Sequence, residues 1–212
     1  MSASLSKGAF ELYEPRSVNK KPKFTIRFLF NPEKVTRKVT PTQAGAQKGT
    51  SSGRQILKDV SLPTENITLN ILLDASVLVE KADQSQQGNT TVEQRGIMPI
   101  LAAFQWLIYP LATQGSESRK KANNVPKYDS PYIIFVWSNT IRLPVNITSI
   151  SITEQEFGPN LMPIRAEVQL SMDVITSDDT TLPEFMRTTY DTTVQFRQQM
   201  VDLYRDQSSK LS

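Results

Sequence analysis

The sequence predicts a mainly β protein with helices (α+β), built from antiparallel strands that form a barrel or a split sandwich. Alternation of apolar and polar residues with a period of two dominates the 212-residue chain. One apolar stripe at helical spacing interrupts the strand patterns near residue 100, and a second follows the last of them. We therefore expect one central helix and one C-terminal helix beside the strands. A chain of this length is typical of one domain.

Three strand patterns precede the central helix. The first covers residues 24–30, whose apolar members alternate onto one face: Phe24, Ile26, Phe28 and Phe30. Asn31-Pro32 ends it, because proline donates no ladder hydrogen bond and restrains the residue before it. A more polar strand follows at residues 34–40. After a Gly- and Ser-rich loop at residues 43–53, alternation from Ile67 to Leu73 predicts the third strand.

The central helix is predicted from apolar residues that recur every three or four positions: Ile97, Leu101, Phe104, Ile108 and Leu111. Pro99 falls in its first turn, where the missing N–H is harmless, and Pro110 marks its end. Such a helix must cover one face of a sheet. Trp106 lies off the stripe and is predicted, like Trp137, to lie in the core or at an interface.

Three strand patterns follow the helix. Residues 132–137 are apolar on both faces, which is typical of a central buried strand. Alternation from Ile141 to Ile147 changes phase at Thr148-Ser149, so we expect a β-bulge there. The last strand puts Ala166, Val168, Leu170, Met172 and Val174 toward a core. Its other face is wet and carries Arg165, Glu167, Gln169, Ser171 and Asp173.

The C-terminal helix starts near residues 180–184 and carries a sparse apolar stripe interrupted at Thr192 and Thr193. It can dock on its own domain or on a neighbouring subunit, and the narrow stripe favours the neighbour. The predicted division is an N-terminal arm (1–22), a β-barrel domain (23–177) and a C-terminal helical extension (178–212).

Composition argues against catalysis. The chain contains neither cysteine nor histidine. It therefore lacks thiol nucleophiles, the commonest general base and the commonest metal ligand. Asp173, Asp178 and Asp179 have no calcium-loop pattern, and Glu154 and Glu156 read as surface charges on one strand face. We predict no catalytic, cofactor-binding or metal-binding residues, and therefore not an enzyme.

Charge and hydropathy restrict the possible partners. The net charge is only +3, and the two basic clusters, at residues 20–23 and 119–121, read as solvated loop edges. No apolar run is long enough to span a membrane, and residues 1–14 lack the pattern of a secretory signal. We therefore predict no nucleic-acid partner and no direct membrane insertion, with assembly in the cytoplasm.

An ordered set of motifs resembles the tube-domain family of contractile injection systems, which are phage-tail-like particles. The set comprises Phe30-Asn31-Pro32-Glu33, a strand ending at Asp74, the central helix, a strand ending at Trp137, Phe157-Gly158, and Pro163-Ile164-Arg165-Ala166. It spans residues 24–176. Ser138 and Pro144 stand where the family often has glycine. No LysM-like pattern is present, so peptidoglycan binding is not carried over.

The resemblance implies a phage-tail-tube-like β-barrel or split sandwich that assembles as a hexameric ring. Neighbouring copies would pair strand edges around a lumen lined by Thr68, Asn70, Arg165, Glu167, Gln169, Ser171 and Asp173. The role most similar is the component that joins the baseplate hub or spike to the inner tube and initiates tube assembly. Implied partners are other copies, inner-tube proteins, the hub or spike, and the sheath or baseplate wedge. Residues 43–53 and the C-terminal helix are the candidate contacts.

Two alternatives stay open. The chain can be the main inner-tube subunit of the same particle. It can also be a monomeric barrel that binds a small ligand, which requires a closed sheet and an apolar cavity.

Overall fold

The protein is described by a computed structural model that covers residues 7–14, 21–42, 62–78, 95–109, 111–112 and 128–210. The strands are β1 (Ala9–Tyr13), β2 (Phe24–Arg27), β3 (Val35–Thr40), β4 (Thr64–Asp74), β5 (Leu111–Ala112), β6 (Tyr128–Asp129), β7 (Tyr132–Val136), β8 (Arg142–Phe157) and β9 (Pro163–Val174). The described helices include α3 (Met98–Gln105) and α4 (Glu184–Ser209).

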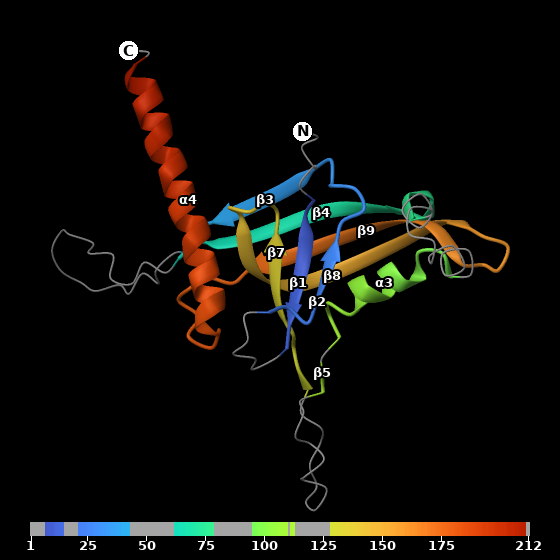
Figure 1. Cartoon of the computed structure of the whole chain (residues 1–212). Coiled ribbons are helices and arrows are strands. Elements are labelled where there is room, and N and C mark those ends of the chain that lie inside the picture. Colours follow the sequence, from blue (N-terminus) through green and yellow to red (C-terminus); the bar gives the residue numbers. More distant parts are fainter. Residues whose placement is uncertain are drawn as a thin grey trace, which may run out of the picture.

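Seven antiparallel strands form one sheet in the order β2-β1-β7-β8-β9-β4-β3, so β2 and β3 are its edges. The long strands β3, β4, β9 and β8 run side by side, and the short strands β7, β1 and β2 cross them steeply (Figure 1). The sheet therefore folds over on itself, as in a split barrel. The predicted mainly β, antiparallel fold class with a central and a C-terminal helix is confirmed.

β8 links these two groups of strands. Its first residues, Arg142–Val145, pair with β7, and from Val145 onward the strand pairs with β9. The register shifts between Ile147 and Ser149, where the sequence predicts a bulge. A bulge increases local bending and twist, which lets one strand belong to both groups.

The core lies between the two groups and centres on Phe10 of β1. Its ring contacts Phe28, Phe104 and Phe135, with centroids 5.5, 6.4 and 5.4 Å away. The strand β1 was not predicted; it falls inside residues 1–22 and pairs with both β2 and β7. Five residues give too short an alternation to distinguish a strand from an arm.

The first predicted strand is too long. β2 ends at Arg27, and both Phe28 and Leu29 are buried, so the backbone turns there. The prediction that Phe30 shares the buried face with Phe28 is wrong, because Phe30 is 40% exposed.

The helix α3 covers the core as predicted, with Pro99 in its first turn. It ends at Gln105, before Pro110, and a turn follows, so the residue that returns to the core is Leu107 and not Ile108. Trp106 lies outside the core and contacts the ring of Tyr109. Trp137 packs against the core.

The helix α4 has 26 residues and crosses the end of the sheet (Figure 1). Its first half docks on its own chain: Met186 packs with Ile134, and Thr193 bonds the backbone of Arg142. The preference for docking on a neighbouring subunit is therefore wrong for this half. Thr193 interrupts the apolar stripe because its hydroxyl makes a buried backbone contact.

Candidate functional site

One face of the β3-β4-β9-β8 layer is polar except at Leu72 of β4, which lies opposite Glu167 and is 43% exposed. The register places the even-numbered residues of β4 opposite the odd-numbered residues of β9. With their neighbours on β3 and β8 they form what we call the polar face: Thr36, Lys38, Asn66, Thr68, Asn70, Ser149, Ser151, Thr153, Arg165, Glu167, Gln169, Ser171 and Asp173. Every residue predicted to face a lumen lies on it. That it lines a lumen stays a prediction.

Cross-strand hydrogen bonds connect β4 to β9 along the polar face. Asn66 Nδ2 donates to Asp173 Oδ1 over 2.8 Å, and Asn70 Nδ2 donates to Glu167 Oε1 over 2.8 Å. Between them, the hydroxyls of Thr68 and Ser171 lie 3.3 Å apart. The amide donors and carboxylate acceptors of this face thus hydrogen-bond to one another. The face remains a solvent-exposed surface of mixed charge.

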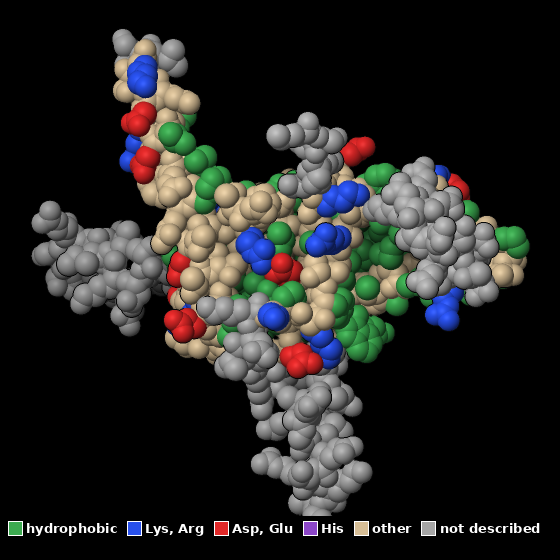
Figure 2. Space-filling view, in the orientation of Figure 1, with side chains coloured by type: hydrophobic (Ala, Val, Ile, Leu, Met, Phe, Trp, Pro, Cys, Tyr) green, Lys and Arg blue, Asp and Glu red, His purple; other side chains and the backbone are tan. Residues whose placement is uncertain are grey.

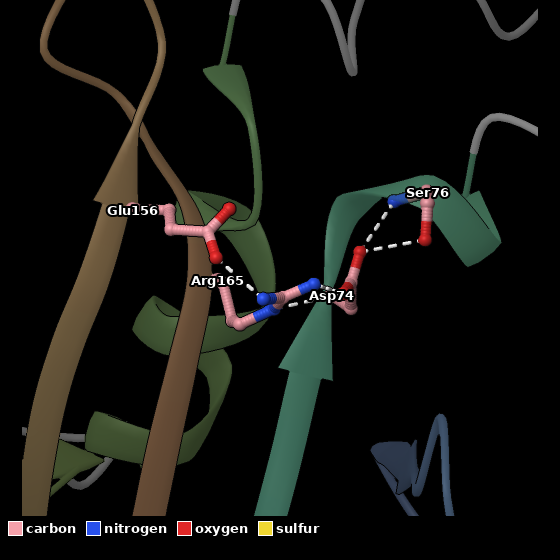
Figure 3. A network of polar contacts seen from close by, with 4 residues as sticks. All are labelled: Asp74, Ser76, Glu156 and Arg165. Atoms are coloured by element: carbon pink, nitrogen blue, oxygen red, sulfur yellow. Dashed lines mark hydrogen bonds and ion pairs between the residues drawn. The ribbon is translucent and has the colours of Figure 1, made fainter.

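Arg165 anchors one end of the polar face (Figure 3). Its Nε and Nη2 both donate to Asp74 Oδ2, over 3.0 and 2.8 Å, and its Nη1 pairs with Glu156. Asp74 Oδ1 accepts bonds from the hydroxyl and backbone N–H of Ser76. The bonds from Ser76, and then those from Arg165, lower the pKa of Asp74 to about 2. The Asp74 and Arg165 motif residues therefore join β4, β9 and β8.

The Phe30-Asn31-Pro32-Glu33 turn borders the polar face. With Lys34 it lines one side of a groove of about 620 Å³, opposite Thr68, Asn70, Glu167 and Gln169. The Asn31 side chain also accepts a bond from the backbone N–H of Gly8 over 3.0 Å. The turn thus joins the start of β1 to the edge of the polar face.

The remaining motif residues serve the fold. The carbonyl oxygen of Pro163 accepts a bond from the Ile97 N–H over 2.9 Å, which fixes the start of α3 against β9. Ala166 is fully buried. Phe157 is half exposed at the end of β8, and Gly158 lies in the turn before β9. These residues hold the hairpin and do not converge on a site.

The β3-β4-β9-β8 layer has two edges that no described strand pairs with. β3 pairs with β4 on one side, and its other side has no described partner strand. The second half of β8, residues 146–157, pairs with β9 alone. Ser149, Ser151 and Thr153 extend the polar face but are not among the residues predicted to face a lumen, although the change of phase after the bulge indicates their side.

No described group of acidic side chains forms a metal site within the ranges given above. Asp179 instead accepts bonds from Thr181, and Asp173 binds Asn66. The prediction that Glu154 and Glu156 share one face is wrong, because the register shifts between them and places them opposite Ala166 and Arg165.

None of the described helices is both long and apolar enough to cross a membrane. Residues 43–53 and 119–121 lie outside the described residues, as does Lys20. The roles predicted for these segments have no structural description here.

Comparison with known proteins gives one family. The model of the family described as "Contractile injection system tube protein" matches residues 4–182. No curated protein matches the chain. Among solved structures, a chain from the "Tail of empty GTA particle computed with helical refinement, C6 symmetry" is 13% identical, covering 67% of this chain and 74% of that one. Its TM-score is 0.25, too low for any conclusion about this chain.

Proposed function

The chain belongs to the contractile injection system tube protein family, and on that premise we propose that six copies form a ring with a hollow axis. The ring joins the baseplate hub or spike to the inner tube and gives the tube a template on which to polymerise. Its work is structural and changes no covalent bond. The observation that carries the proposal is the pair of open edges on either side of the polar layer.

The two edges are suited to one another. Within the layer, β3 and β8 run in opposite directions, because three antiparallel pairings separate them. Rotation about a ring axis that is parallel to the strands leaves the direction of every strand unchanged. The β3 edge of one copy therefore meets β8 of the next in antiparallel orientation, and closure removes both open edges.

Side chains on the two edges also match by face. On the polar face, the β3 edge carries Thr36 and Lys38, and the β8 edge carries Ser149 and Ser151. On the opposite face, the β3 edge carries Val35 and Val39, of which Val39 is 58% exposed, and the β8 edge carries the half-buried Ile150 and Ile152. Pairing would cover these apolar groups and continue the polar face around the axis.

The main inner-tube subunit is the second candidate, favoured by the family description itself. The adaptor is preferred because α4 lies beyond residues 4–182, the part that matches the family. Copy number separates the two roles. A purified particle with one or two rings of this chain supports the adaptor, and one with dozens of rings supports the tube subunit.

The monomeric ligand-binding barrel requires a closed sheet and an apolar interior cavity. The described sheet has two edges, and the groove at the Phe30–Glu33 turn lies on its polar face. Native mass spectrometry of the full-length chain tests the ring. We expect a six-copy species. A monomer at every protein concentration contradicts the proposal.

A further inference from the structure

The docking face of α4 continues well past the surface that it covers. The side of the helix that contacts the body of the chain carries Met186, Tyr190, Thr193 and Arg197. Tyr204 follows Met186 by eighteen residues, about five full turns, and so lies on the same side. Met200 and Val201 flank it there. These three side chains, which we call the distal stripe, are 41–70% exposed.

The contacts of α4 give its direction across the sheet. Met186 packs on Ile134 of β7, Thr193 bonds Arg142 of β8, and Arg197 holds Glu65 of β4 with two bonds of 2.8 and 3.0 Å. Glu65 is 6% exposed and also has Arg37 of β3 3.8 Å away. The helix therefore advances from β7 toward the β3 edge of the sheet.

Beyond Arg197 the helix runs for another twelve residues, about 18 Å. One strand spacing of about 4.8 Å brings it from β4 to β3, so about 13 Å extends past the edge. Figure 1 shows α4 rising beyond β3, and Figure 2 shows hydrophobic side chains along the projecting part.

We infer that the distal stripe of α4 binds the next copy of this chain, at the end of its sheet. This inference rests on the proposed ring, in which β3 pairs with that copy. The surface beyond β3 then belongs to the neighbouring copy, and the part of α4 beyond Arg197 crosses the interface between the two copies. The same helix face that holds the end of its own sheet thus fastens the adjacent one.

Two variants with equal charge and spacing test the inference. M200D/Y204D introduces carboxylates into the distal stripe, and Q195D/Q199D introduces them on the opposite, exposed side of the same helix. We expect M200D/Y204D to raise the dissociation constant of the ring at least about tenfold, because carboxylates would replace buried apolar contacts. Q195D/Q199D should assemble like the wild type. Thermal unfolding of the separated monomers verifies that both variants are folded.

Photo-crosslinking identifies the molecule that binds the distal stripe. The chain has no cysteine, so Tyr204→Cys carries a benzophenone maleimide at one known position. We expect a covalent product between two copies, with no such product from Gln195→Cys.

The outcomes separate this inference from the proposed function. A wild-type ring that is unaffected by M200D/Y204D, or a crosslink only within one chain or to a different protein, overturns the inference and leaves the ring intact. A wild-type chain that forms no ring overturns both.

Discussion

At the scale of single residues, Gly96 has the least room for a side chain among the glycines that the structure describes. Its φ is +53°, and an added Cβ would lie 2.2 Å from the carbonyl oxygen of Pro163. That carbonyl binds Ile97 at the start of α3, so relief of the clash would separate the helix from β9.

We predict that Gly96→Ala lowers the free energy of unfolding by about 2 kcal/mol or more, through positive-φ strain and steric overlap. Chemical denaturation measures this. Gly158→Ala is the control, because an added Cβ there has its nearest neighbour at 3.7 Å. Equal stability of the two variants would contradict the account of the α3–β9 contact.

Asp74 makes a second residue-scale prediction, concerning pH. Its folded-state pKa lies near 2, below the ordinary value of 3.8, so it stabilises the fold above pH 3.8. This contribution is lost as pH falls from 3.8 through about 2. Asp74→Asn should therefore cost about 1 kcal/mol at neutral pH, a figure reduced for solvent screening, and little at pH 2. Urea denaturation at the two pH values measures both costs, and a loss independent of pH would contradict the assignment.

At the scale of secondary-structure elements, one buried threonine is among the residues that hold the first half of α4. Thr193 Oγ1 donates to the Arg142 carbonyl over 2.7 Å and accepts from the Arg142 N–H over 3.1 Å. Its exposed neighbour Thr192 bonds only within the helix, to the Thr188 carbonyl.

We predict that Thr193→Val, which keeps the shape and removes the hydroxyl, destabilises the protein by about 1–3 kcal/mol, because two buried backbone groups lose a partner. Thr192→Val should change stability by less than about 0.5 kcal/mol. Thermal unfolding of the two variants compares them directly. A smaller loss for Thr193→Val than for Thr192→Val would show that α4 is not held there.

The elements also show where sequence patterns are sufficient. Strong alternation from Ala166 to Val174 predicts both the strand β9 and its buried face. The phase change at Thr148-Ser149 predicts the bulge in β8. Short or mixed segments are harder: β1 has five residues, and Phe30 continues an apolar pattern although the backbone has already turned.

The polar face was predictable strand by strand, because its side chains alternate with buried ones. Which of its side chains lie opposite one another on neighbouring strands was not predictable. The contact between Asp74 and Arg165 joins residues 91 positions apart, and only the strand register brings them together. The contact of Thr193 with a strand backbone likewise leaves no periodic signal in the sequence.

At the scale of the whole molecule, the split barrel has one layer with a polar face, and this layer ends at two edges that no described strand pairs with. A single copy leaves these edges open to solvent, and a closed ring of copies covers them. The proposed lumen, the edge pairing and the overhanging α4 then belong to one arrangement.

This arrangement predicts protection that depends on assembly. Gln169→Cys places a thiol at the centre of the polar face, and Glu184→Cys places one at the start of α4, on an exposed position. We expect a bulky polymer maleimide to modify both variants as monomers but only Glu184→Cys fully in the ring, because six polymers crowd one lumen. Mass spectrometry counts the labels. Full modification of Gln169→Cys in the ring would place the polar face outside.

A cryo-electron microscopy reconstruction of the assembled chain tests the proposed ring most directly. We expect six copies around a hollow axis, with β3 of each beside β8 of the next and Gln169 and Ser171 lining the channel. A single copy with no like neighbour, or a ring whose channel is lined by other strands, would contradict it.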